Sequence, residues 1–232
     1  MTIKLLHNSP LWLASHAIRM SHDNHHLSDT SNSDDNIGVK DRQLIARVGN
    51  KLKHKSVLEQ LVYWFDIDGI SRACLQELAR HRTARLTVKS SRYTLDEVKK
   101  AGDLFTYYTA SWLWKWDIIE KFIVLTGDAE VDSASACALS SLQDALCSGI
   151  SNDKAKYCLP EAFKTRLQFQ LDGRNLQNFL ELRTSKDALW EIQQLAKAIY
   201  EALPSEHKYL YSEYVANNSD CSTDSNDATA TE

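Results

Sequence analysis

The sequence predicts an α+β fold that is mostly helical and contains a small sheet. Its 232 residues are 43% hydrophobic and 25% charged, the ordinary balance of a globular domain. Only 7 Gly and 3 Pro occur, far fewer than the many turns of a sandwich or barrel require. We expect a single domain over residues 1–215, followed by a disordered acidic tail over residues 216–232 that lacks large apolar side chains.

The first 81 residues predict two strands, two helices and one long loop. Aromatic and β-branched residues predict the strands, apolar residues at helical spacing predict the helices, and a run of Asn, Asp and Ser predicts the loop. In order, these elements are a short strand at 3–6, a mobile loop at 22–39, a helix at 40–54, a buried strand at 61–67 and a helix that ends near residue 81. Asp68 and Ser71 are the two candidate N-caps of the last helix.

The rest of the chain predicts an irregular segment and five helices. Apolar residues at helical spacing support the helices, and Pro204 ends the last of them. The irregular segment covers residues 83–93, and the helices cover residues 95–116, 117–125, 133–147, 174–182 and 185–203. The sequence shows no internal repeat and no linker long enough to divide it into two domains.

Several classes of site are excluded. Glycine-rich phosphate loops need closely spaced glycines, whereas no two glycines here are closer than 11 residues. The 5 Cys form no C-x-x-C pair, which indicates a reducing compartment without a zinc knuckle. His22, His25 and His26 suggest a metal site, but no carboxylate or cysteine accompanies them at ligand spacing on a regular element. We therefore expect a solvated loop there and no metal.

The sequence also points to a compartment. No apolar run approaches the length of a membrane-spanning helix, and polar residues and Pro10 interrupt the start of the chain where a signal peptide would need an apolar stretch. We expect a cytoplasmic protein with no membrane partner.

Positive charge is concentrated in one segment. The net charge is −4, and the acidic tail alone carries four acids and no Lys or Arg, so the rest of the chain is neutral overall. Against that background, residues 72–92 hold six Lys and Arg residues and a single acid, Glu77. Since Arg matches phosphate oxygens with a planar fork, this segment predicts a phosphate site, with a basic helix C-terminus as the alternative. The pI of about 6.1 favours a small phosphorylated ligand over nucleic acid.

Two motifs resemble those of the flavin-dependent thymidylate synthases. The string RHR at 80–82, followed after seven residues by Ser90, resembles the family signature R-H-R-x7-S. The string NLQNFLELR at 175–183, followed by ALWEI at 188–192, resembles the C-terminal segment of the family. A weaker similarity links HKSVLE at 54–59 to the segment of the family that contacts the flavin. The two specific motifs stand in the order that the family has.

The resemblance, which covers roughly residues 40–203, implies an enzyme that methylates dUMP to dTMP. In the family, methylenetetrahydrofolate donates the one-carbon unit, FAD carries the hydride and NADPH reduces the FAD. The implied assembly is a homotetramer whose active sites each draw on more than one subunit. Arg183 would activate the uracil electrostatically, in place of a cysteine nucleophile. The alternative is a catalytically silent protein of the same fold that binds a nucleotide or RNA.

The resemblance also implies roles for individual positions. Arg183 is the expected catalytic residue. The expected FAD contacts are His54, Ser56, Arg80, His81, Arg82, Val88, Asp172, Arg174 and Asn178. The expected dUMP contacts are Glu77, Arg80, Val88, Lys89, Ser90, Ser91, Arg92, Lys156 and Arg183. No motif identifies the folate site.

Several of these positions depart from the commoner pattern of the family. Glu77 replaces a usual Gln, and Lys156 replaces a usual Arg, which keeps the charge but loses the fork. Val88 stands where Glu is frequent, so only its backbone could contact a ligand. Asp172 and Asp187 replace a frequent Asn and His. Glu77 and Asp187 therefore add negative charge where anionic ligands should bind.

Overall fold

Four strands that are far apart in sequence form the central sheet. The computed structural model describes residues 1–31, 37–108 and 111–215, and the expected tail at 216–232 lies outside them. The strands pair in the order β1-β2-β6-β3, and every neighbouring pair is antiparallel. They are β1 (Thr2–Asn8), β2 (Val62–Ser71), β3 (Arg85–Val88) and β6 (Lys164–Asp172). The expected strands at 3–6 and 61–67 correspond to β1 and β2.

Strand β6 has no counterpart among the expected elements, although its sequence alternates. Thr165, Leu167, Phe169 and Leu171 are buried, and the residues between them are more exposed. A period of two is typical of a strand that buries one face. The expectation of an irregular segment at 83–93 is wrong in part, because β3 pairs with β6 there.

Strand β2 continues beyond its expected end because Asp68 lies within the sheet. A register shift follows Asp68, where Gly69 adopts a φ of +83° that costs glycine little. Ser71, not Asp68, therefore caps helix α3 (Arg72–Ala79), and its hydroxyl oxygen accepts a hydrogen bond from the N–H of Cys74 at 2.9 Å.

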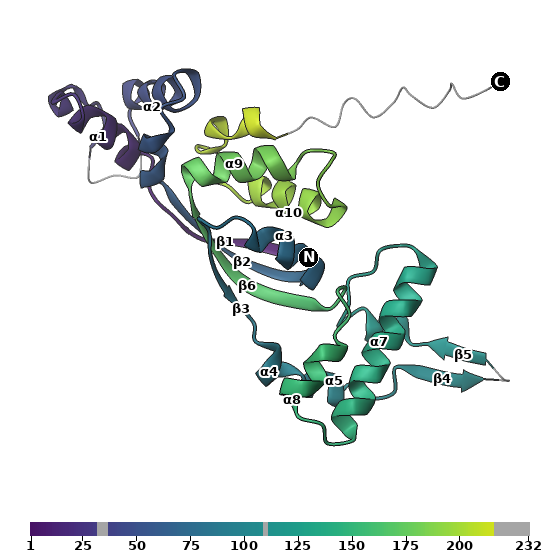
Figure 1. Cartoon of the computed structure of the whole chain (residues 1–232). Coiled ribbons are helices and arrows are strands. Elements are labelled where there is room, and N and C mark those ends of the chain that lie inside the picture. The colour runs from purple at the N-terminus through teal and green to yellow at the C-terminus, as the bar shows by residue number, and fades with distance from the viewer. Residues whose placement is uncertain (32–36, 109–110, 216–232) are drawn as a thin grey trace, which may run out of the picture.

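Three helices cover one face of the sheet: α3, α9 (Gly173–Arg183) and α10 (Trp190–Glu201) (Figure 1). The main apolar core lies between these helices and the sheet, and it includes Phe169 and Phe179. The helix expected at 174–182 is confirmed. The helix expected at 185–203 starts later, because residues 185–189 form the turn that reverses the chain between α9 and α10.

A helical extension lies at one end of the sheet (Figure 1). It contains α1 (Trp12–Met20), α2 (Val39–Ile45), a π-helical stretch at Ala46–Lys51 and a 3-10 helix at Lys55–Gln60. The helix expected at 40–54 is thus confirmed at its start but changes type at residue 46. The loop expected at 22–39 holds a 3-10 turn at His25–Leu27, and its residues 32–36 lie outside the described part.

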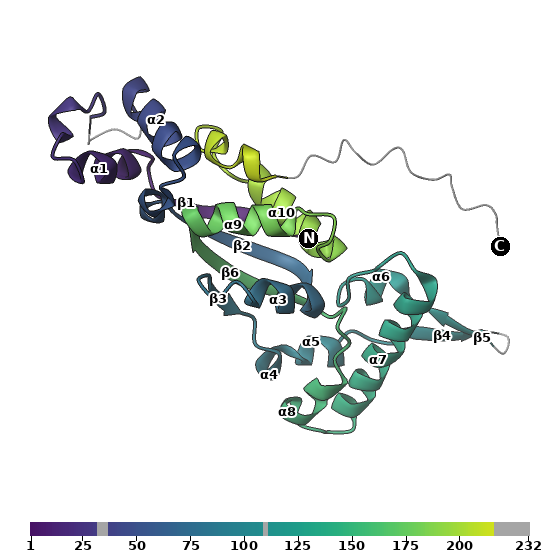
Figure 2. The same ribbon diagram turned by 45° about the horizontal axis from the view of Figure 1, so that its top comes forward.

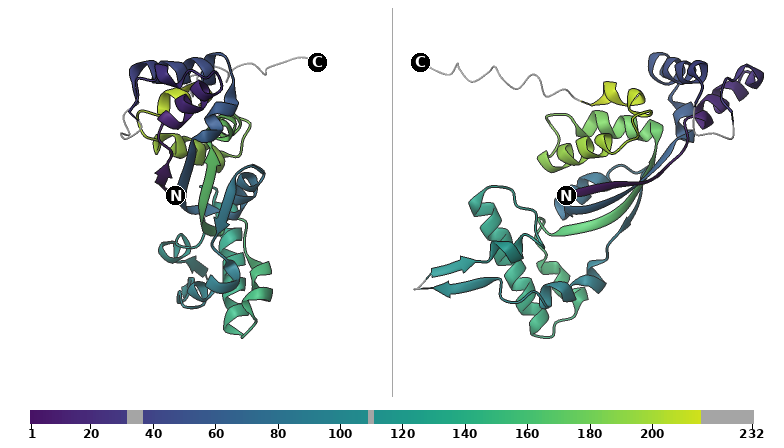
Figure 3. Two further views of the ribbon diagram at one scale, coloured as in Figure 1. Left: turned by 90° about the vertical axis from the view of Figure 1, so that its left-hand side faces the viewer. Right: turned by 180° about the vertical axis from the view of Figure 1, so that it is seen from behind.

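Helix α7 (Ala129–Cys147) organises a second apolar cluster at the opposite end of the molecule (Figures 2 and 3). Leu95, Val98, Leu139 and Leu142 are fully buried in it. Short elements surround α7, namely α4 (Ser91–Thr94), α5 (Asp96–Lys99), β4 (Phe105–Tyr108), β5 (Ser111–Trp114), α6 (Trp116–Ile119), α8 (Asn152–Ala155) and a 3-10 turn at Lys156–Cys158. Two more 3-10 turns, at Lys208–Leu210 and Ser212–Tyr214, follow α10.

The helices expected at 95–116 and 117–125 are wrong over most of their length. Helix α5 ends at Lys99, and Gly102 then adopts a φ of +77° that a helix does not allow. The aromatic-rich residues that follow pair as the β4–β5 hairpin, because such residues favour strands. The helix expected at 133–147 is confirmed as α7. Within the described residues, no helix is both long and apolar enough to cross a membrane.

Candidate active site

Arg183 is the last residue of α9, and its guanidinium meets the end of α3. Its Nε donates a hydrogen bond to Nε2 of His81 at 2.8 Å, and its Nη1 donates to Oε2 of Glu77 at 2.8 Å. Its Nη2 donates to the backbone carbonyl of Glu77 at 3.0 Å. The side chain is 14% exposed, so a ligand can still reach it. The structure thereby brings together residues from the RHR segment and the C-terminal motif.

His81 is neutral in this arrangement. Burial, together with the positive charge of Arg183, lowers the pKa of its imidazole to about 4. Because Nε2 accepts a hydrogen bond from Arg183, the ring proton is on Nδ1. The ring also packs edge-to-face against Phe179, with 5.0 Å between centroids. His81 is therefore a fixed acceptor for Arg183 and not a cation.

Arg80 and Arg82 flank His81 and extend toward solvent. The side chain of Arg80 is 74% exposed, and its Nη1 lies 3.6 Å from Oε1 of Glu77. Arg82 is also exposed and forms no ion pair with any described residue. Exposed guanidinium groups of this kind remain available for phosphate oxygens.

A buried carboxylate fixes the start of α3. Glu191, in the first turn of α10, is 3% exposed and accepts hydrogen bonds from both the backbone N–H and the hydroxyl of Ser71. The N–H of Ser71 lies 2.8 Å from Oε1. Because Ser71 caps α3, Glu191 ties α10 to the helix that carries Glu77. Glu191 stands within ALWEI, but the sequence does not indicate its role, because its partner is 120 residues away.

The expected phosphate loop lies in a different part of the chain. Arg92, in α4, is 57% exposed, and its Nε lies 3.3 Å from a carboxylate oxygen of Asp153 in α8. Ser90 is the N-terminal flanking residue of α4 and is exposed. Lys156, which follows α8, is half-buried. These groups gather around α4 and α8.

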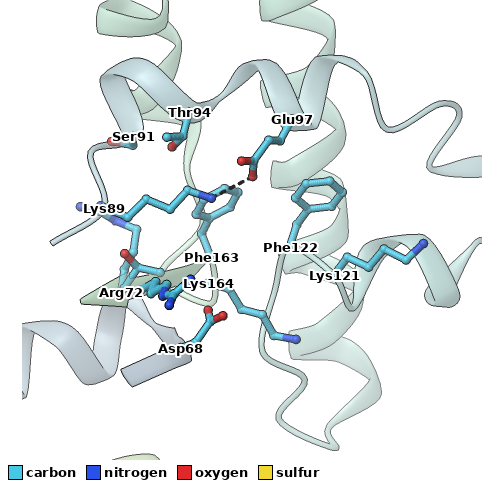
Figure 4. Close-up of a pocket in the computed structure, with 12 residues that line it drawn as sticks. Asp68, Arg72, Lys89, Ser91, Thr94, Glu97, Lys121, Phe122, Phe163 and Lys164 are labelled. Atoms are coloured by element: carbon cyan, nitrogen blue, oxygen red, sulfur yellow. Dashed lines mark hydrogen bonds and ion pairs between the residues drawn. The ribbon is translucent and has the colours of Figure 1, made fainter. Parts of the chain in front are cut away.

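Lys89 and Ser91 of the same loop line a cavity of about 300 Å³ (Figure 4). Lys89 forms an ion pair with Glu97 at 2.8 Å. The remaining lining residues are Asp68, Arg72, Thr94, Lys121, Phe122, Phe163, Lys164, Thr165 and Arg166. Lys121 and Lys164 were not among the expected site residues, because no motif connects them to the loop. The cavity has more cations than acids, which suits an anionic ligand.

Three of the remaining expected flavin contacts lie on two neighbouring elements, with Ser56 on the 3-10 helix of the extension and Arg174 and Asn178 on α9. Ser56 and Asn178 are exposed, and Arg174 donates a hydrogen bond from Nη1 to Glu59 at 2.7 Å. Asp172 is engaged as the N-cap of α9, where it accepts from the N–H of Asn175 at 2.9 Å. Its carboxylate therefore already has a structural role.

His54 lines a second cavity, of about 560 Å³, in the helical extension. Lys40 and Arg47 contribute positive charge to its wall, and Leu44 and Val48 contribute apolar surface. A wall with both properties suits a ligand that has a flat ring and phosphate groups. Together with the exposed Arg and Ser side chains, this donor set fits FAD.

The structure does not bring all the expected nucleotide contacts together within one chain. Among the described residues, no hydrogen bond or ion pair joins Glu77, Arg80 or Arg183 to the groups around α4 and α8. Helix α9 lies over the face of the sheet, whereas α4 and α8 lie beyond strand β3, next to α7 (Figures 1 and 2). Val88 ends β3 with an exposed side chain, and Asp187 is exposed in the turn after α9.

Cys74, on the same helix as Glu77, is not accessible for covalent catalysis. Cys74 is fully buried on α3, and burial raises the pKa of its thiol well above the usual range. Cys137, Cys147 and Cys158 are exposed but lie on or next to the α7 end of the molecule. Arg183, by contrast, is partly exposed and carries a positive charge next to Glu77 and His81.

The family match, the similar sequences and the similar structures all point to one group of proteins. Residues 4–207 match the family described as thymidylate synthase complementing protein. The chain is 51% identical over 216 residues to the flavin-dependent thymidylate synthase of Wolinella succinogenes, covering 91% of this chain and 97% of that protein. It is 47% identical over 211 residues to the protein of the same name from Campylobacter jejuni, covering 91% and 96%. A crystal structure of thymidylate synthase X from Helicobacter pylori with FAD and dUMP matches with a TM-score of 0.85 at 42% identity, covering 94% of this chain and 100% of that one.

Proposed function

The chain belongs to the family of flavin-dependent thymidylate synthases, and we propose that it methylates dUMP to dTMP with methylenetetrahydrofolate as the one-carbon donor and NADPH as the reductant. The observation that carries this proposal is the contact between Arg183 and the end of α3. Two motifs that are about a hundred residues apart in sequence form one cationic site there. The relative from Helicobacter pylori was crystallised with FAD and dUMP, which supports the same ligands here.

Arg183 activates the uracil in this proposal. A guanidinium stays protonated in proteins, so it stabilises negative charge on the ring and does not take a proton. A preorganised donor at such a position contributes on the order of 2.7–4 kcal/mol to transition-state stabilisation. The low exposure of Arg183, at 14%, reduces competition from water. Arg80 and the loop of Ser90, Ser91 and Arg92 bind the nucleotide, with Lys89, Lys156, Glu77 and the backbone of Val88 completing its surroundings.

FAD supplies the hydride chemistry when it is bound. The chain offers His54, Ser56, Arg174 and Asn178 from the helical extension and α9, and Arg80, His81 and Arg82 from the end of α3. Their exposed cationic and hydroxyl groups match the pyrophosphate and ribose of a dinucleotide. Asp172 supports this site indirectly, because it caps the helix that carries Arg174 and Asn178. Val88 contributes its backbone alone.

The active assembly is a homotetramer in which each site draws on more than one chain. Arg183 and the phosphate loop around α4 and α8 lie in different places within one chain, which supports a site that is shared between chains. A second copy can supply the phosphate loop to the Arg183 of the first. We place the protein in the cytoplasm, without a membrane partner. We also propose no nucleic-acid partner, since a pI of about 6.1 gives no general affinity for polyanions.

Purified protein supplied with FAD tests this proposal. We expect a yellow protein whose flavin spectrum changes when dUMP is added. It should release tritium from dUMP labelled at C5 only when methylenetetrahydrofolate and NADPH are both present. A protein that takes up no FAD, or that binds an oligonucleotide with steep salt dependence and ignores dUMP, would instead be a nucleotide- or RNA-binding protein of the same fold.

A further inference from the structure

Glu77 lies between the two arginines of the uracil site. Its Oε2 accepts a hydrogen bond from Nη1 of Arg183 at 2.8 Å, and its Oε1 lies 3.6 Å from Nη1 of Arg80. Its backbone carbonyl accepts a further N–H of Arg183 at 3.0 Å. Both carboxylate oxygens are thus engaged with guanidinium groups, which leaves Glu77 poorly placed for the direct contact with dUMP that the resemblance implies.

These contacts use some, but not all, of the N–H donors of Arg183. A guanidinium carries five N–H donors in a fixed plane. Three of them are used, one by His81 and two by Glu77, so two remain for a ligand. A carbonyl oxygen and an ionised ring nitrogen of a pyrimidine are acceptors that a planar fork can bind together. The orientation of the guanidinium therefore decides whether those two donors can reach the ring.

Glu77 also changes the charge at the site. Arg80 and Arg183 each carry one positive charge, and Glu77 carries one negative charge. His81 adds none at neutral pH, because it is neutral there. The net charge of this cluster is one positive charge, which is half of what the two arginines alone would present to an anionic nucleotide.

We propose that Glu77 is a positioning residue for Arg183, which holds the guanidinium plane toward the uracil and lowers the positive charge that the nucleotide meets. This inference rests on the proposed function, in which Arg183 activates the ring. Glu77 acts through Arg183 and does not touch the reacting atoms. Its carboxylate favours turnover through orientation, and its charge opposes dUMP binding.

Two substitutions at one position separate orientation from charge. Glu77→Gln removes the charge but keeps a side-chain oxygen that can accept from Nη1 of Arg183. Glu77→Leu removes the charge and the acceptor while keeping a similar volume. Both variants should bind dUMP about 1.5- to 5-fold more tightly than the unchanged protein, the range expected for a partly exposed charge. Glu77→Gln should keep kcat within about twofold, whereas Glu77→Leu should lose about tenfold to a hundredfold in kcat through misorientation.

Glu181→Gln is the matched control. Glu181 lies on α9 two residues before Arg183, is exposed, and forms no hydrogen bond or ion pair with any described residue. Its removal changes the net charge by the same amount and should leave dUMP binding and kcat unchanged. Binding is measured by calorimetry with the FAD-loaded protein, turnover by tritium release, and folding by thermal melting.

The outcomes distinguish this inference from the function on which it rests. An active protein in which Glu77→Leu and Glu77→Gln turn over equally fast would overturn the positioning role. An active protein whose Glu77→Gln variant binds dUMP no more tightly than Glu181→Gln would overturn the charge role. An unchanged protein that binds dUMP and FAD but releases no tritium would refute the proposed function itself.

Discussion

Arg183 and His81 are 102 residues apart in sequence, yet Nε of the arginine donates a hydrogen bond to Nε2 of the histidine at 2.8 Å. The bond joins the last residue of α9 to the second residue after the end of α3. It requires a neutral imidazole, and burial beside the Arg183 charge ensures this by lowering the pKa of His81 to about 4. The RHR motif and the C-terminal motif therefore act as one structural unit.

Replacing Arg183 with Lys should lower kcat by about 10²–10³-fold, because one preorganised electrostatic donor contributes on that order. Lys keeps the charge but cannot form a planar set of bonds to His81 and to Oε2 and the backbone carbonyl of Glu77. Tritium release measures the loss, and flavin absorbance should show that FAD remains bound. Arg85→Lys, on the exposed strand β3, is the control and should keep full activity. Unchanged turnover of Arg183→Lys would remove the guanidinium from the mechanism.

Stability should fall between pH 6.5 and 4. Burial lowers the pKa of both His81 and His207 to about 4 in the folded chain, whereas an unfolded histidine titrates near 6.5. As the pH falls through this window, these histidines bind protons in the unfolded state but stay neutral in the folded state. The free energy of unfolding therefore decreases. Each histidine contributes at most ~1.4 kcal/mol per pH unit. Below pH 4 their contribution levels off.

His207→Gln isolates one of these contributions. Nδ1 of His207 lies 2.7 Å from the hydroxyl of Tyr63, which itself accepts from Tyr211 at 2.8 Å, so Tyr63 donates to the imidazole. Gln can replace the acceptor but does not titrate. Urea unfolding at pH 7, 6 and 5 should show a shallower loss of stability in the variant. The same slope in both proteins would contradict the assignment to His207.

Replacing Glu191 with Ala should lower the free energy of unfolding by about 1–3 kcal/mol, because it leaves buried hydrogen-bond donors of Ser71 without a partner. Glu213→Ala removes an exposed carboxylate and should have little effect. The Ser71→Ala/Glu191→Ala double variant should lose less than the sum of the single changes, since the two residues share one interaction. Additive losses in urea unfolding would show that the two residues stabilise the chain independently.

Shared active sites predict complementation between inactive variants. Arg183→Ala and Arg92→Ala should each have little activity when assayed alone at low dUMP concentration. Co-expressed chains should regain activity, because a mixed assembly contains sites with one intact Arg92 and one intact Arg183 from different chains. A chain that carries both substitutions, co-expressed with Arg183→Ala, is the control and should regain none. Failure of the first mixture would place each whole site within a single chain.

Periodicity predicted the long amphipathic elements well and the short ones poorly. Helices α7 and α9 were predicted because their apolar stripes repeat over many residues. The β4–β5 hairpin was predicted as helix, because its aromatic residues also fall at helical spacing and only pairing decides between the two states. Strand β6 showed clear alternation at residues 165–171 and could have been predicted from it.

Some residues of the candidate site could likewise be predicted from the sequence, and others could not. Arg183 and residues 80–82 were expected because they stand in recognisable motifs, and the structure brings Arg183 together with His81. Glu191 stands within ALWEI and Lys164 stands in no motif, but the role of each depends on residues that only folding brings close to it. The engagement of Glu77 with two arginines also depends on how α3 and α9 meet, which spacing along the chain does not specify.

The thiol of Cys74 is buried, which limits the kinds of compound that could inhibit the protein. A compound that traps a nucleophilic sulfur would not reach Cys74, and among the exposed cysteines Cys137 and Cys147 lie on α7, whereas Cys158 lies two residues after Lys156. If two chains share each site, as proposed above, selective molecules would be anions shaped to guanidinium groups of both chains. Their affinity would then weaken as ionic strength rises, unlike that of a covalent reagent.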